Sequence, residues 1–75
     1  MNKDRRKRLC KIIEQADELL EQLQAIEEEE QTALDNTPES LQLTDRYADM
    51  EMAVEAMAEA ADSLTVIING LEGIL

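Results

Sequence analysis

The chain has 75 residues and a formal net charge of −11, with no His, a single Cys and a single aromatic residue. A chain of this length buries only about 60% of its unfolded surface when it folds alone, so a further stabilising device is expected. A lone cysteine excludes an internal disulfide and the lack of His argues against a metal site, which leaves self-association. Because no serine or cysteine has an evident base nearby, we predict a non-enzymatic protein with no cofactor and no bound metal.

The charged residues are segregated along the chain. Six of the seven basic residues lie in the opening run KDRRKRLCK, whereas seventeen of the eighteen acidic residues follow position 12. Such an acidic body repels nucleic acid and anionic membranes and attracts basic protein surfaces. No apolar segment follows the basic run as in a secretory signal, and no stretch approaches the roughly 20 apolar residues that span a bilayer. We therefore predict a cytoplasmic protein whose partner is a protein with a basic surface. Nucleic acid and membranes are not expected among its partners.

The first predicted element is a helix over residues 3–34. From Leu9 onward, its apolar residues recur at alternating steps of three and four, the spacing of a heptad seam with Leu9 at position a and Ile12 at position d. Position e is also apolar at Ile13 and Leu20, so the stripe is wide enough to contact two neighbouring helices. We expect the a and d rows to face the second helix.

Residues 35–43 are predicted to connect two helices. Pro38 cannot continue a helix, so the chain must break there. Asn36 and Glu39 have the spacing of a capping box, which predicts one short helical turn after the proline. Two leucines are then free to cover the open end of the bundle: Leu41 and Leu43.

The second predicted helix covers residues 44–73. Thr44 has the chemistry of an N-cap, and the acidic Asp45 in the first turn is favoured by the helix dipole. Positions a and d are apolar again, and the extra apolar position is g. Because the connector is short, the helices must be antiparallel. The heptad register then places Ile26 near Val54, and Leu19 near Ala61.

The fold class predicted from this pattern is all-α: a single antiparallel helical-hairpin domain over residues 1–75 that pairs into a four-helix bundle or a higher oligomer. A hairpin alone would leave half of each wide stripe in water, so a second copy of the chain is the first predicted partner. The predicted oligomer core is Leu9, Ile12, Ile13, Leu19, Leu20, Leu23, Ile26, Val54, Met57, Ala61, Leu64, Ile67, Ile68 and Leu71.

The connector also contains the candidate ligand-binding residues. Thr44, Arg46, Tyr47 and the free N–H groups of the first turn could bind an anion beside a stacking ring, with Gln42 close by. A nucleotide has that chemistry. The alternative is structural: Tyr47 continues the core, and Arg46 pairs across the hairpin with Glu30, which occupies an a position.

In the stretch DNTPESLQLTDRYADMEMAVEAM, the chain resembles a group of small proteins encoded by phages and prophages of Firmicutes and other gut bacteria. These proteins share a basic start, an acidic first helix and an N-x-P-E-x-L-Q-x-[ST]-x-R connector. The resemblance implies a bacterial host cytoplasm and a context in which small accessory proteins bind and disable host factors. The matching connector residues are Asn36, Pro38, Glu39, Leu41, Gln42, Thr44 and Arg46.

Three functions are compatible with these features. The leading hypothesis is an accessory protein that blocks a host process, such as antiphage defence, by covering a basic surface of a host protein with its acidic faces. The second is an oligomeric sponge that sequesters a nucleotide-type immune signal at the connector. The third is a helical module with a structural or assembly role.

Overall fold

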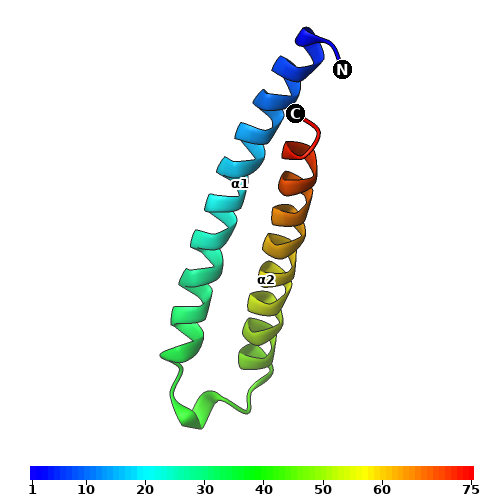
Figure 1. Ribbon diagram of the computed structural model, residues 1–75. Coiled ribbons are helices and arrows are strands. Elements are labelled where there is room, and N and C mark those ends of the chain that lie inside the picture. The colour runs from blue at the N-terminus through cyan, green and yellow to red at the C-terminus, as the bar shows by residue number, and fades with distance from the viewer.

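The computed structural model describes all 75 residues and forms a two-helix hairpin (Figure 1). Helix α1 spans Lys3–Asp35, the 3-10 turn η1 spans Glu39–Leu41, and helix α2 spans Asp45–Glu72. The helices lie side by side and antiparallel, which gives a rod of 59 × 14 × 14 Å. The prediction of an all-helical antiparallel hairpin is confirmed.

Side chains of polar residues define both ends of α1. The Asn2 side-chain oxygen accepts a hydrogen bond from the backbone N–H of Arg5 at 2.9 Å, so one of the free donors of the first turn is satisfied. At the other end, the Thr37 hydroxyl donates to the carbonyl of Ala33 at 2.9 Å. Pro38 follows directly and prevents further helix.

The start of α2 is fixed by the predicted N-cap, Thr44. Its hydroxyl oxygen accepts from the backbone N–H of Tyr47 at 3.3 Å, and the same hydroxyl donates to the carbonyl of Leu41 at 2.7 Å. One side chain therefore begins the helix and ties it to the preceding turn.

Replacing Thr44 by alanine is expected to lower the free energy of unfolding by about 1 kcal/mol, because both hydrogen bonds of the hydroxyl are lost. Thr44→Ser is the matched control, since it keeps the hydroxyl and should stay close to the wild type. Urea denaturation followed by circular dichroism measures both variants. Equal destabilisation by Ala and Ser would contradict a capping role.

The connector differs from its prediction in two respects. A short turn does form at η1, but no side chain caps it, because Asn36 instead closes the last turn of α1 through its backbone N–H. The predicted capping box between Asn36 and Glu39 is therefore wrong. Leu41 lines the hollow at the loop end but is 50% exposed, and Leu43 is 99% exposed, so neither leucine is buried over the end of the single hairpin.

The contact between the helices defines a seam of residues that are buried or half-buried. On α2 they occupy positions a and d, as the sequence predicts. On α1 they occupy a and e, so the predicted d row is not in the seam. The seam residues of α1 are Leu9, Ile13, Ala16, Leu20, Leu23, Glu27, Glu30 and Leu34. Those of α2 are Tyr47, Met50, Val54, Met57, Ala61, Leu64, Ile68 and Leu71.

The d row of α1 faces solvent in the hairpin. Ile12, Leu19 and Ile26 are 53%, 59% and 53% exposed. Leu19 and Ile26 therefore lie outside the contact between α1 and α2, where the sequence pattern had placed them. A single neighbouring helix covers only one edge of a stripe three positions wide, and here the covered edge is formed by a and e.

The core of the hairpin is thin. Only Ile13, Ala61 and Ile68 are buried, at 6%, 5% and 4% exposure. All three belong to the seam, so the contact between α1 and α2 supplies the whole of the buried core.

Candidate functional site

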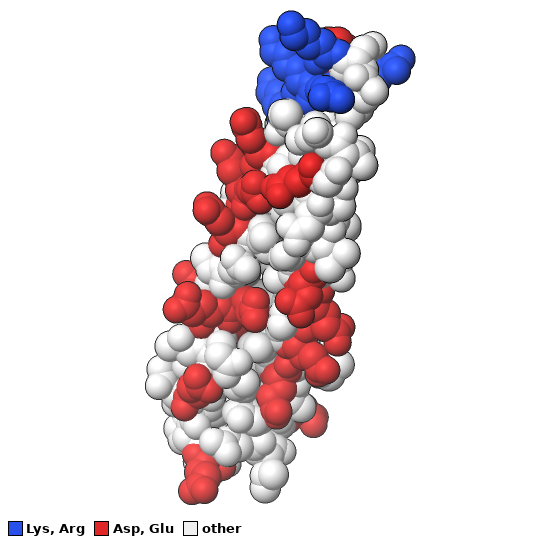
Figure 2. Space-filling model, viewed as in Figure 1, with Lys and Arg blue, Asp and Glu red and all other residues white.

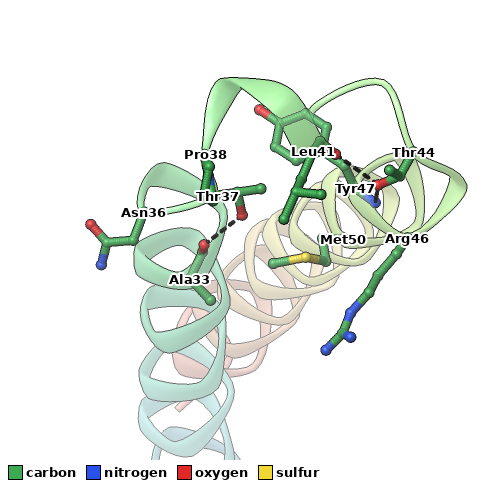
Figure 3. A pocket seen from close by; sticks show the side chains of 9 residues that line it. All are labelled: Ala33, Asn36, Thr37, Pro38, Leu41, Thr44, Arg46, Tyr47 and Met50. Atoms are coloured by element: carbon green, nitrogen blue, oxygen red, sulfur yellow. Dashed lines mark hydrogen bonds between the residues drawn. The ribbon is translucent and has the colours of Figure 1, made fainter.

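A hollow of about 490 Å³ opens at the loop end of the hairpin, between the end of α1, η1 and the start of α2 (Figure 3). It brings together three of the four candidate residues named from the sequence: Thr44, Arg46 and Tyr47. Ala33 and Pro38 contribute to its wall from the other side. The connector fold thus gathers residues that the sequence had only placed close along the chain.

The side chains around this hollow do not converge on one point. Leu41 occupies the middle of the view, the Tyr47 ring lies beside it, and the Arg46 side chain extends away from both (Figure 3). The Thr44 hydroxyl is already engaged as the cap of α2. The hollow is therefore a mostly apolar surface with the Arg46 cation at its margin. A nucleotide site would need several polar groups that converge on the phosphate and the base.

The fourth candidate, Gln42, has a local structural contact. Its side-chain amide donates to the carbonyl of Thr37 at 3.3 Å, which bridges the two ends of the connector. Gln42 does not line the hollow.

The predicted ion pair between Glu30 and Arg46 is wrong. The one ion pair of the hairpin joins Arg8 and Asp4 on α1, at 3.1 Å and on the surface. Glu30 is a seam residue, whereas Arg46 immediately precedes a seam residue and points to the side of the hairpin. The Arg46 guanidinium is therefore free.

Two glutamates take part in the seam, of which sequence reasoning had identified only one. Glu27 and Glu30 are half-buried, while their neighbours Glu28 and Glu29 are exposed. The signal was present in the sequence, because Glu27 and Glu30 continue the spacing of three and four that runs from Leu23 to Leu34. The run of four glutamates is therefore divided between the seam and the surface.

One side of the hairpin, which we term the acidic face, consists of the residues that directly follow seam residues. Consecutive residues of a helix are turned by about 100°, and because the helices are antiparallel this turn brings both rows to the same side. All its acidic members are exposed, and no Lys or Arg lies among them. They are Glu14, Asp17, Glu21, Glu28 and Asp35 on α1 and Glu51, Glu55, Asp62 and Glu72 on α2.

The charge distribution in space follows the segregation along the chain. Figure 2 shows acidic side chains along both helices, and basic side chains gathered at the end that holds the N-terminus. Since the single ion pair lies within that basic end, the carboxylates of the body have no basic partners. The body of the hairpin therefore presents an uncompensated negative surface.

Two further features bear on the kind of site. Nowhere do three or more acidic or thiol side chains come together as a metal site would require. Neither helix contains a stretch that is both long and apolar enough to cross a membrane.

Comparisons with protein-family models, with curated proteins and with solved structures found no match for this chain.

Proposed function

We propose that the protein is a non-enzymatic, phage-type accessory protein that self-associates and blocks a host factor by covering a basic surface with its acidic face. The observation that carries the proposal is the composition of that face, where exposed carboxylates of both helices lie on one side without a single basic residue. A surface of this kind attracts cationic partners over long range and gains affinity from many weak contacts.

The rows of carboxylates suit a partner surface that normally binds a polyanion. Acidic residues of this face are three to ten positions apart, so successive carboxylates lie about 4.5–15 Å apart along each helix axis. The face extends along a rod 59 Å in length. It therefore offers an extended series of negative charges, the property by which a nucleic-acid backbone is recognised.

Neutralising three carboxylates in the middle of the acidic face is expected to weaken partner binding by about tenfold, since exposed charge pairs contribute roughly 0.2–1 kcal/mol each. The variant is Glu51→Gln, Glu55→Gln and Asp62→Asn. Binding is measured by capture from host extract, elution with salt and with duplex DNA, and titration of the eluted protein.

The matched control removes the same three charges elsewhere. Glu18→Gln, Glu39→Gln and Glu59→Gln lie on the outer edges of the helices and in the connector, outside the acidic face. The affinity of this control variant for the partner should fall distinctly less than that of the acidic-face variant. Both variants should keep the mass and helicity of the wild type. Equal loss in both would show that only net charge matters, and no loss in either would refute the proposed interface.

A second candidate function uses the hollow at the connector. The gathering of Thr44, Arg46 and Tyr47 around one opening supports sequestration of a nucleotide-type signal by the associated protein. A thermal-shift screen with cyclic nucleotides and ADP-ribose derivatives tests this function. A ligand that raises the melting temperature of the wild type but not of Arg46→Ala would support it. The absence of any shift would leave the acidic-face function as the proposal.

A further inference from the structure

The hairpin exposes more surface than a compact protein of its mass. Its accessible surface is 5890 Å², whereas a compact 8.5 kDa monomer exposes about 4,700 Å², an excess of about 1,200 Å². Its radius of gyration is 17.3 Å, compared with about 11 Å for a compact chain of this length. The excess exceeds the roughly 800 Å² that each partner buries in a stable interface of standard size.

The side of the hairpin opposite the acidic face is apolar. This apolar face consists of the residues that directly precede seam residues, and the same antiparallel geometry places both rows on one side. It has no charged residue over the central part of either helix. Its central members are Ile12, Gln15, Leu19, Gln22 and Ile26 on α1 and Ala53, Ala56, Ala60, Ser63, Ile67 and Gly70 on α2.

The bulky members of this face are exposed within a single chain. Ile67 of α2 is 55% exposed, in addition to the exposed d row of α1. An uncharged, mostly apolar surface with exposed bulky side chains on an otherwise charged rod marks an interaction site.

We infer that the apolar face binds the same face of a second copy, with the two loops at opposite ends of a four-helix bundle. This inference rests on the self-association included in the proposed function and adds to it the surface and the orientation. Each α1 then packs antiparallel on the partner's α1, and each α2 on the partner's α2, about a two-fold axis that crosses the hairpin.

The charges at the two ends of the α1 row select this orientation. The two charged residues of this row are Arg8 at its start and Glu29 near its end, which lie eleven residues before and ten residues after Leu19. With Leu19 on the two-fold axis, Arg8 of each copy meets Glu29 of the other. The neighbouring basic residues, from Lys3 to Lys11, then lie along the acidic run of the other copy at positions 27–30.

The alternative orientation, with both loops at the same end, has the opposite electrostatics. Each α1 would then pack on the partner's α2, which brings Glu29 close to Asp49 near the loops. The basic end would meet the region of Gly70, where the apolar face has no acid. Glu29 would then face Asp49, with Arg46 of the same row one turn nearer the loop, and the basic run of each copy would lie at the opposite end from the acidic run at positions 27–30 of the other.

Side-chain size on α2 agrees with loops at opposite ends. Leu19 lies sixteen residues before the end of α1, and Ala60 lies fifteen residues after the start of α2, so both are at about the same level of the hairpin. An axis through Ala60 places Ala53 of one copy opposite Ile67 of the other. Small residues then receive bulky ones, as close packing requires.

Spin labels on the loop test the orientation without touching the interface. Ser40 lies in the exposed η1 turn, and Ser40→Cys in a Cys10→Ser background carries one label per chain. Pulsed dipolar spectroscopy is expected to give a distance close to the 59 Å length of the hairpin when the loops are at opposite ends. Loops at the same end would give roughly 10–30 Å, since packed helices are about 8–10 Å apart.

Light scattering on the same sample separates the possible failures. A short distance in a sample of dimer mass would overturn the orientation but leave self-association standing. A monomer mass with no distance between chains would overturn both the orientation and the self-association of the proposed function.

A cysteine at position 19 tests the face itself. In the Cys10→Ser background, Leu19→Cys is expected to form a disulfide-linked dimer under mild oxidation, because only residues close to the axis meet their own copy. The matched control is Ile12→Cys, which would lie about 20 Å from its own copy and should stay unlinked. Equal cross-linking of both variants, or of neither, would overturn the inference.

Discussion

Replacing Ile67 by aspartate is expected to dissociate the protein and to unfold most of the resulting chains. Ile67 lies on the apolar face, so in the inferred dimer two copies of the new carboxylate enter an apolar contact. The lost burial of two isoleucines and the desolvation of two charges together cost at least about 5 kcal/mol per dimer. Light scattering should show a monomer mass, and circular dichroism should show reduced helicity at 25 °C.

The neighbouring residue provides the control. Val66 is also β-branched and is 70% exposed, but it points away from the seam and from both faces. Val66→Asp introduces the same charge one position earlier, with the same cost in helix propensity and the same interaction with the end of α2. Its mass and helicity should remain close to the wild type. Equal behaviour of the two variants would contradict an interface on the apolar face.

Replacing Ile68 by alanine is expected to lower the free energy of unfolding by about 2–4 kcal/mol, the usual cost of truncating a buried isoleucine. Ile68 is the least exposed side chain of the thin core, at 4%. Urea denaturation at a fixed protein concentration measures the change, because the stability of an associating chain depends on concentration.

Val66→Ala is the control for this substitution. It also truncates a β-branched side chain on α2, but one that is exposed, so the loss should be small or offset by the better helix propensity of alanine. A similar loss in both variants would show that position 68 does not belong to the core.

Three consecutive residues of α2 thus report on three different environments. Val66 faces solvent, Ile67 belongs to the apolar face and Ile68 belongs to the seam. Substitutions at these positions separate the stability of the hairpin from association of its copies. They do so within one helical turn, where local propensity is nearly constant.

The inferred dimer has a consequence for the proposed function. Joining two apolar faces turns the two acidic faces outward on opposite sides of the bundle. Each dimer would then offer two equivalent acidic surfaces to basic partners. Two such surfaces would raise the apparent affinity for a partner that is itself dimeric, provided both can bind at once.

In the connector, the sequence predicts which residue caps α2 but not the direction of each side chain at the candidate site. Thr44 was identified correctly as a cap, because capping depends on a side chain and a backbone N–H three residues apart. The direction of Arg46 depends on how α2 is rotated against α1, which neighbouring residues do not specify. The sequence therefore placed Arg46 beside Thr44 and Tyr47 but could not show that its side chain extends away from Tyr47 and Leu41.

The ends of the helices were determined by the sequence alone. Asn2, Pro38 and Thr44 act through hydrogen bonds or steric limits that span a few residues, so their effect does not depend on the rest of the fold. The heptad spacing likewise determined that two amphipathic helices would pair, and the short connector determined that they would be antiparallel.

Only the tertiary structure decided which edge of the α1 stripe lies in the seam. Positions a, d and e are all apolar in this helix, so the local pattern allows contact with α2 through either edge. The hairpin buries Ile13 and leaves Leu19 exposed, because one neighbouring helix covers only part of so wide a stripe. The rotation of α1 about its own axis therefore follows from packing against α2, and this rotation places Ile12, Leu19 and Ile26 on the open apolar face.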